Sequence, residues 1–165
     1  MPVDQAVYRD AMSRLGAAVN VITTDGPGGR AGFTASAVCS VTDTPPTLLV
    51  CANRTNDSYP PLLANGVLCV NTLTPAQKDL SPLFAGMTEH SMDGRFEGRT
   101  WHTLQTGSPV LDEAVVAFDC VITDKAEVGT HTVFFCSVEA IRTGDAHEGL
   151  IYYGRGYHHV IAAKK

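Results

Sequence analysis

Residues 30–41 read Arg-Ala-Gly-Phe-Thr-Ala-Ser-Ala-Val-Cys-Ser-Val, and an apolar run at 47–52 and the polar run Asn-Arg-Thr-Asn-Asp-Ser at 53–58 follow them. Within the first segment, residues 34–37 are all small, so no large side chain shields the main chain. Their hydroxyls and amides suit a flat heteroaromatic ring with polar edges. The run at 53–58 adds short donors and one guanidinium, a combination that holds a phosphate. Ring and phosphate together indicate a nucleotide-like cofactor.

The same residues have a simpler interpretation. Ser, Thr and Asn between strands often satisfy nearby backbone groups as turns and helix caps, without any ligand. On the residues alone this alternative stays open.

Length and composition favour one ordinary globular domain over residues 1–165. The chain is 44% hydrophobic and 18% charged, and its formal charge of -5 argues against nucleic acid as the main partner. No apolar run approaches the roughly 20 residues that span a bilayer, and the amino terminus lacks the order of a signal peptide. We therefore expect a cytoplasmic protein.

The five cysteines are odd in number, lie in apolar runs and include no Cys-x-x-Cys pair. We expect them to be reduced core residues rather than disulfide partners or metal ligands. No His-x-x-x-His or His/Cys cluster has ligand spacing, so no metal is expected.

Local patterns predict more strands than helices. Apolar residues at spacings of three and four predict a helix within 4–15, and the β-branched run at 18–24 predicts a strand that forms a hairpin through 25–29. That turn matches G-x-G-x-x-A, but no helical pattern follows it, so we interpret it as a turn and not as a dinucleotide motif.

Further along, Asp57 or Ser58 can cap a helix that ends at Asn65, and residues 67–73 form a strand. A capping box at 74–77 predicts a helix reaching residue 83 or 84. Residues 85–108 are irregular. Strands at 114–123, 126–141 and 150–153, the first two separated by Asp124-Lys125, complete an antiparallel, mainly β barrel with a few short peripheral helices.

His131 is the clearest candidate for chemistry. It opens a strand beside Gly129, where it can contact a ligand amide or supply a proton, although a surface histidine in a turn would look the same. Residues 152–157, which are aromatic and basic, can wall a ring site or close an edge strand. The chain has no Gly-x-Ser-x-Gly elbow, and the lack of an acid, base or nucleophile set suits hydride transfer, which depends on proximity and orientation.

Taken together, these residues resemble the short-chain flavin reductases with an FMN-binding split-barrel fold, and in particular the reductase components of 4-hydroxyphenylacetate 3-monooxygenase and similar two-component systems. The resemblance covers nearly the whole chain. Its pieces are, in order, residues 23–24, 32–41, 45–46, 53–54 with Ser58, Asn71, 84–88, Met92 with 95–96, 129–132 and 152–157.

The resemblance implies a mainly β, antiparallel split barrel that forms a homodimer. It also implies an oxidoreductase that uses NADH, less often NADPH, to reduce FMN or FAD for a separate monooxygenase, by hydride transfer from nicotinamide C4 to flavin N5. A non-catalytic flavoprotein that transfers electrons or stores the cofactor is the alternative. The choices between FMN and FAD and between NADH and NADPH stay open, as do the partner oxygenase and whether flavin is a substrate or a bound group.

The resemblance also assigns site residues. The isoalloxazine would be lined by Thr34, Ala35, Ser36 and Ala37, with support from Ser40 and Val41. The ribityl and phosphate end would be held by Asn53, Arg54, Thr55 and Ser58, and the flavin side would be closed by Phe84, Ala85 and Gly86. The nicotinamide would meet His131 and Tyr157. Where this family often has Gly-Asp-His, the chain has Gly129-Thr130-His131, which bears on the nicotinamide contact.

Overall fold

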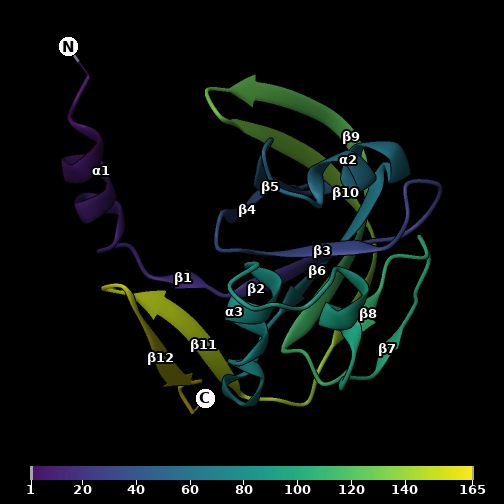
Figure 1. Cartoon of the computed structure of the whole chain (residues 1–165). Coiled ribbons are helices and arrows are strands. Elements are labelled where there is room, and N and C mark those ends of the chain that lie inside the picture. The colour runs from purple at the N-terminus through teal and green to yellow at the C-terminus, as the bar shows by residue number, and fades with distance from the viewer. Residues whose placement is uncertain (1, 165) are drawn as a thin grey trace.

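The computed structural model describes residues 2–164, and antiparallel strands dominate it (Figure 1). In chain order the elements are α1 (Gln5–Met12), β1 (Ala17–Ala18), β2 (Asn20–Thr24), β3 (Ala31–Ala35), β4 (Val38–Asp43), β5 (Pro46–Asn53), α2 (Tyr59–Asn65), β6 (Val67–Thr72), the 3-10 helix η1 (Pro75–Gln77), α3 (Leu80–Phe84), the 3-10 helix η2 (Asp93–Phe96), β7 (Trp101–His102), β8 (Val110–Leu111), β9 (Val116–Val128), β10 (His131–Thr143), β11 (Glu148–Tyr153) and β12 (Gly156–Ile161). The expectation of a mainly β protein with a few short helices is confirmed.

One seven-stranded sheet, in the order β3-β2-β6-β9-β10-β5-β4, forms the body of the molecule. Every neighbouring pair in it is antiparallel. Its two edge strands, β3 and β4, are consecutive in the chain and are joined only by Ser36 and Ala37. The sheet must therefore curl until its edges approach each other, but no ladder between β3 and β4 closes it within the described chain. We refer to the gap between these two edges at Ser36 and Ala37 as the seam.

Strand β2 lies between two cores because its β-branched residues alternate across the sheet. Ile22 packs into the larger core with Phe33, Leu62 and Phe134. Val21, on the opposite face, packs into the second core, which includes Leu80, Phe84, Phe96 and Leu150. All five residues of β2 are buried, so this strand fixes the start of β3 relative to both cores.

The smaller elements lie around this sheet. β1, β11 and β12 form a three-stranded sheet, and α1 stands apart from the body beside it (Figure 1). No residue of α1 is buried. None of the helices in residues 2–164 combines the length and apolar character needed to cross a bilayer.

Several local predictions are confirmed. The turn after β2 leads directly into strand β3, so the glycine-rich motif there is a hairpin turn. Helix α2 ends at Gly66, whose φ of 67° lies in the left-handed region that favours glycine. At Thr74 the backbone N–H donates to the Gln77 side chain over 3.0 Å, as the capping box requires.

Other predictions are wrong. The expected helix from residue 75 to 84 is two pieces, η1 and α3, interrupted at Lys78 and Asp79. The break between the long strands lies at Gly129-Thr130 rather than at Asp124-Lys125, so β9 continues to Val128.

The end of the chain and three small side chains also differ from expectation. The sequence predicts its last strand at 150–153, yet a further strand, β12, follows it and contains His158 and His159. Ser58 precedes α2 but makes no side-chain capping bond. Cys69, Cys120 and Cys136 are buried as expected, whereas Cys51 is half-buried and Cys39 is exposed; all five thiols are free.

Candidate active site

Two small cavities share a wall at residues Thr34, Ala35 and Ser36, next to the seam. The first, of about 230 Å³, is lined by Phe33, Thr34, Ala35, Ser36, Ala37, Cys51, Asn53, Asn56 and His131. The second, of about 190 Å³, is lined by Val19, Thr34, Ala35, Ser36, Ser81, Tyr152 and Tyr157. We call them the seam cavity and the tyrosine cavity.

The seam leaves backbone donors available. The carbonyl of Ser36 accepts from Val38 N–H over 2.9 Å, and the carbonyl of Ala37 accepts from Cys51 N–H over 3.0 Å. The amide N–H groups of Ser36 and Ala37 donate to no acceptor within residues 2–164, and both residues are exposed. Two unused amide donors on a wall of small side chains fit the polar edge of a flat ring.

His131 also lines the seam cavity, at the first position of β10, where it pairs in register with Asn53 of β5. Its Nδ1 lies 2.9 Å from the Thr130 hydroxyl. No group among the described residues bonds to its Nε2. The exposed ring therefore offers one free nitrogen beside the cavity.

The Arg54 side chain reaches the same turn. Its guanidinium donates to the carbonyl of His131 over 2.9 Å and also to the carbonyl of Gly129. Its backbone N–H donates to the carbonyl of Thr130 over 3.0 Å. Arg54 thus contacts three consecutive residues of the turn between β9 and β10.

The loop at 53–58 stabilises itself. The Asn53 side-chain oxygen accepts from both the N–H and the hydroxyl of Thr55, at 3.0 and 2.9 Å, and the Asn56 oxygen accepts from Ser58 N–H at 2.8 Å. The turn-forming role that the sequence left open is therefore real. It does not exclude a ligand, because Asn53 and Asn56 also line the seam cavity.

In the tyrosine cavity, Ser81 of α3 connects two elements. The hydroxyl of Thr34 donates to its carbonyl over 2.6 Å, and the hydroxyl of Tyr157 donates to its Oγ over 2.7 Å. The rings of Tyr152 and Tyr157 lie 5.4 Å apart between centroids, at an interplanar angle of 64°. Because Tyr157 lines the tyrosine cavity and His131 lines the seam cavity, the shared wall at residues 34–36 lies between them.

The structure brings together Thr34, Ala35, Ser36, Ala37, Asn53 and His131 of the predicted site, and it adds Tyr157 in the second cavity. The remaining predicted residues line neither cavity. Ser40 lines a separate cavity with Cys39, while Val41 is exposed on β4.

Besides Arg54, five more predicted residues lie outside the two cavities. Ser58 is fully buried, and its hydroxyl donates to the Gly32 carbonyl over 2.9 Å. Phe84 is buried in the second core, edge-on to Phe96 at 5.2 Å between ring centroids. Ala85 and Gly86 follow it and are exposed. Thr55 is exposed as well.

Sequence reasoning missed the lining residues Val19, Cys51 and Ser81, whereas Asn56 and Tyr152 lie in the runs 53–58 and 152–157 that it singled out. Cys51 and Asn53 alternate along β5 and so share one face, a signal that the sequence contained. Burial, and secondarily the neighbouring Cys39, raise the pKa of the Cys51 thiol, so it remains protonated near neutral pH. No local signal indicated that α3 would bring Ser81 to this wall.

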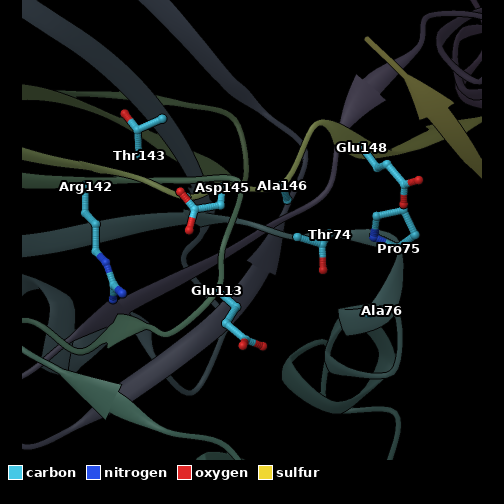
Figure 2. A pocket seen from close by; sticks show the side chains of 10 residues that line it. Thr74, Pro75, Ala76, Glu113, Arg142, Thr143, Asp145, Ala146 and Glu148 are labelled. Carbon is cyan, nitrogen blue, oxygen red and sulfur yellow. The ribbon is translucent and has the colours of Figure 1, made fainter.

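A larger cavity, of about 410 Å³, lies elsewhere, between η1 and the connection from β10 to β11 (Figure 2). Figure 2 shows the carboxylates of Glu113, Asp145 and Glu148 around it, with Arg142. Arg142 bonds to Asp112 over 2.6 Å and thereby lowers the pKa of that carboxyl. Because three carboxylates face one paired guanidinium, this cavity is unsuited to a phosphate-bearing anion, and the two smaller cavities are the better candidate.

Comparison with known proteins gives a consistent result. The family described as "Flavin reductase like domain" matches residues 12–160. A protein of Stutzerimonas stutzeri (strain A1501) named "FMN reductase (NADH) RutF" is 59% identical over 157 residues, which cover 95% of this chain and 89% of that protein.

Two solved structures are also similar. The NADH:FAD oxidoreductase SgcE6 of Streptomyces globisporus C-1027 has a TM-score of 0.86 and 26% identity, covering 96% of this chain and 94% of that one. The styrene monooxygenase flavin reductase of Pseudomonas putida S12 has a TM-score of 0.81 and 25% identity, covering 95% and 99%. The fold, the seam with its free amides and the family match over residues 12–160 agree: this chain belongs to the flavin reductase like domain family.

Proposed function

We propose that this protein is an NADH-dependent flavin reductase that reduces FMN or FAD and supplies the reduced flavin to a separate monooxygenase. The observation that carries the proposal is the seam cavity, which is lined by His131 and by small residues that include Ser36 and Ala37, whose backbone amides are unused, in a chain of this family. When bound, the flavin and nicotinamide supply hydride transfer from nicotinamide C4 to flavin N5.

The chain's own residues bind and orient the two molecules. The amides of Ser36 and Ala37 would donate to the pyrimidine edge of the flavin ring, where negative charge develops, and fixed donors stabilise such charge without rearranging. Thr34 and Ala35 would form the wall beneath the ring. His131 would contact the nicotinamide, with Tyr157 on the other side of the wall.

For the ribityl and phosphate end we propose Asn53, Thr55 and Ser58, of which Thr55 is exposed. The resemblance also assigns Arg54 to this end, but its guanidinium already donates to the carbonyls of Gly129 and His131. Ser58 would reach a phosphate only by giving up its bond to Gly32. Ser40, Val41, Phe84, Ala85 and Gly86 would act around the ring from outside the two cavities.

FMN is the favoured flavin, because relatives that are 57–59% identical are named FMN reductase (NADH). NADH is the favoured nucleotide for the same reason. The name of the Streptomyces structure includes FAD, so both flavins need to be compared directly.

We also propose the larger-scale properties that the family resemblance implies. The curled sheet with its open seam would be a split barrel, and residues 1–165, of which the first and last lie outside the described part, would form one flavin reductase domain. The protein would be a homodimer. A cytoplasmic location would suit its five free thiols, since thiols stay reduced there.

The test is a steady-state assay of the purified protein with NADH or NADPH and added FMN or FAD. We expect NADH oxidation that saturates with added flavin, with a higher kcat/KM for FMN. A protein that retains a yellow flavin through purification and does not oxidise NADH would instead be a flavoprotein for storage or electron transfer. Absence of any flavin binding in a fluorescence titration would overturn both.

A further inference from the structure

We infer that Arg54 is a positioning residue for His131, and that its guanidinium serves the nicotinamide contact more than the flavin phosphate. This inference rests on the proposed function. Its basis is the three hydrogen bonds from this one residue to Gly129, Thr130 and His131, two from the side chain and one from the backbone.

The turn gains from such support because no packed side chain holds it, and apart from Arg54 it is held by the strand pairings that begin at His131. Gly129, Thr130 and His131 are all exposed, and so are the last six residues of β9. Gly129 has a φ of 55°, in the left-handed region, and nothing lies within 4 Å of where its Cβ would be. A turn with no packed side chains opens easily unless hydrogen bonds restrain it.

Only an arginine side chain can make both side-chain hydrogen bonds to the turn, and we call this pair of bonds the clamp. The two carbonyls belong to residues on either side of Thr130, and a planar guanidinium can donate to both at once through its two terminal nitrogens. A lysine ammonium carries the same charge but lacks that rigid fork. If the positive charge of Arg54 were what mattered, Arg54→Lys would behave as wild type. If the forked shape matters, Arg54→Lys should fail as Arg54→Met does.

Thr130 completes the restraint at the ring. Its hydroxyl lies 2.9 Å from His131 Nδ1, so the ring has a fixed rotation while Arg54 fixes the backbone. His131 thus meets the seam cavity with a defined free nitrogen.

The experiment compares Arg54→Met and Arg54→Lys with the wild-type full-length protein, using NADH with FMN and with riboflavin, which has no phosphate. We expect both variants to raise the KM for NADH about 10-fold, because small misplacements at a reacting centre are costly. The ratio of the KM values for FMN and riboflavin should stay unchanged. Arg14→Met is the matched control, because Arg14 is an exposed arginine just after α1 that pairs with Asp10, and it should behave as wild type.

A double-mutant cycle adds a readout that a purely structural role would not affect. Once His131→Ala has removed the ring, Arg54→Met should cost little more, so the two effects should not add. The His131 ring resonances, assigned by their loss in His131→Ala, should shift toward those of a free histidine in Arg54→Met. This spectrum needs no active enzyme, so it tests the clamp even if the proposed function fails.

Two results would overturn the inference. One is a loss of the preference for FMN over riboflavin in Arg54→Met that Arg54→Lys restores, which would make the guanidinium a phosphate ligand. The other is full additivity with His131→Ala together with unchanged His131 resonances. A wild-type protein that oxidises no NADH with any flavin would overturn the proposed function instead.

Discussion

Asp119 is fully buried on β9, and its carboxylate holds the loop before β8. One of its oxygens accepts from the N–H groups of Gln105 and Thr106, each at 2.8 Å, and the other accepts from the Thr106 hydroxyl. A buried charge is tolerated only when such bonds satisfy it. A single side chain thus fixes much of an otherwise irregular segment.

Asp119→Asn should therefore destabilise the protein. The amide keeps the shape but replaces one acceptor oxygen by an NH2 group that faces donors, so we expect a loss of about 1–3 kcal/mol in the free energy of unfolding. Urea denaturation measures it. Asp124→Asn, on the exposed part of the same strand, is the control and should change stability by less than about 0.5 kcal/mol. If Asp119→Asn and Asp124→Asn lowered the free energy of unfolding equally, burial of Asp119 would not be the cause.

Cys136 gives a prediction for alkaline pH. Burial raises the pKa of this thiol to about 12. The unfolded chain releases that proton at a lower pH than the folded chain, so the stabilisation is complete below the unfolded pKa and is lost as pH rises toward 12. Unfolding free energy should fall above pH 9, and the fall should be shallower in Cys136→Ala under reducing conditions. An identical slope in the two proteins would show that other groups cause the fall.

His131→Ala should raise the KM for NADH much more than the KM for flavin, because the ring offers its free nitrogen beside the seam cavity. Steady-state kinetics with each substrate varied in turn measures this difference. His90→Ala, in an exposed loop, serves as control. A defect confined to flavin would remove His131 from the nicotinamide site.

For individual residues, the sequence indicated much of the candidate site, because residues 34–37 and 53–58 are continuous segments whose composition is visible directly. The sequence could not show in the same way whether Phe84 lies in the core or at the site. Whether an aromatic residue packs in a core or against a ligand depends on what faces it, and here Phe96 and Trp101 do. The roles assigned to the site residues themselves remain predictions.

Among the elements, β3 and α3 depend on one glycine. A Cβ at Gly32 would lie 2.8 Å from an edge carbon of the Phe84 ring and 3.1 Å from the Ile22 carbonyl. The helix carrying Ser81 can therefore pack on the strand carrying Thr34 only because this position has no side chain.

Gly32→Ala should force α3 away from β3 and cost about 1–3 kcal/mol in unfolding free energy through overpacking. It should also weaken flavin binding, since the Thr34–Ser81 bond would lengthen. Thermal unfolding and a flavin fluorescence titration measure the two effects. Gly98→Ala, at a glycine with open space around it but a φ of 77°, separates backbone strain from crowding. A fully stable Gly32→Ala protein would contradict the packing argument.

The long hairpin shows why the element boundaries were harder to predict than the elements. The polar pair Asp124-Lys125 looks like a turn, yet β9 runs through it because its outer half is exposed and tolerates polar side chains. The actual turn is marked by Gly129, whose positive φ the sequence does not reveal. Strand β12 was missed for a related reason, since its exposed residues give no apolar alternation.

For the whole molecule, exposed apolar side chains on α1 and just beyond it support the proposed homodimer. Val7 and Met12 of α1 are 61% and 44% exposed, and Leu15, three residues after the helix ends, is 62% exposed. Apolar side chains gathered on one short exposed segment suit a partner surface. We expect the wild type to sediment as a dimer and the double variant Val7→Lys, Leu15→Lys to sediment as a monomer. Arg9→Glu on the same helix is a control for charge alone. A monomeric wild type, or a dimeric double variant, would contradict this prediction.

The overall class was predictable, whereas the strand order was not. Local patterns of β-branched residues and turns identify strands, but pairing β6 with β9 joins segments about 50 residues apart, and no local pattern encodes that choice. The split barrel is what the family resemblance implies and stays a prediction, whereas the structure shows the antiparallel seven-stranded sheet.

The seam has one further consequence, which concerns exchange of amide protons with solvent. The amides of Ser36 and Ala37 have no acceptor within residues 2–164, so they should lose their protons to deuterated water rapidly, while those of buried β2 exchange slowly. A ligand that accepts from both would slow only this pair. Mass spectrometry of a peptide spanning the two residues would then report occupancy in the absence of any turnover.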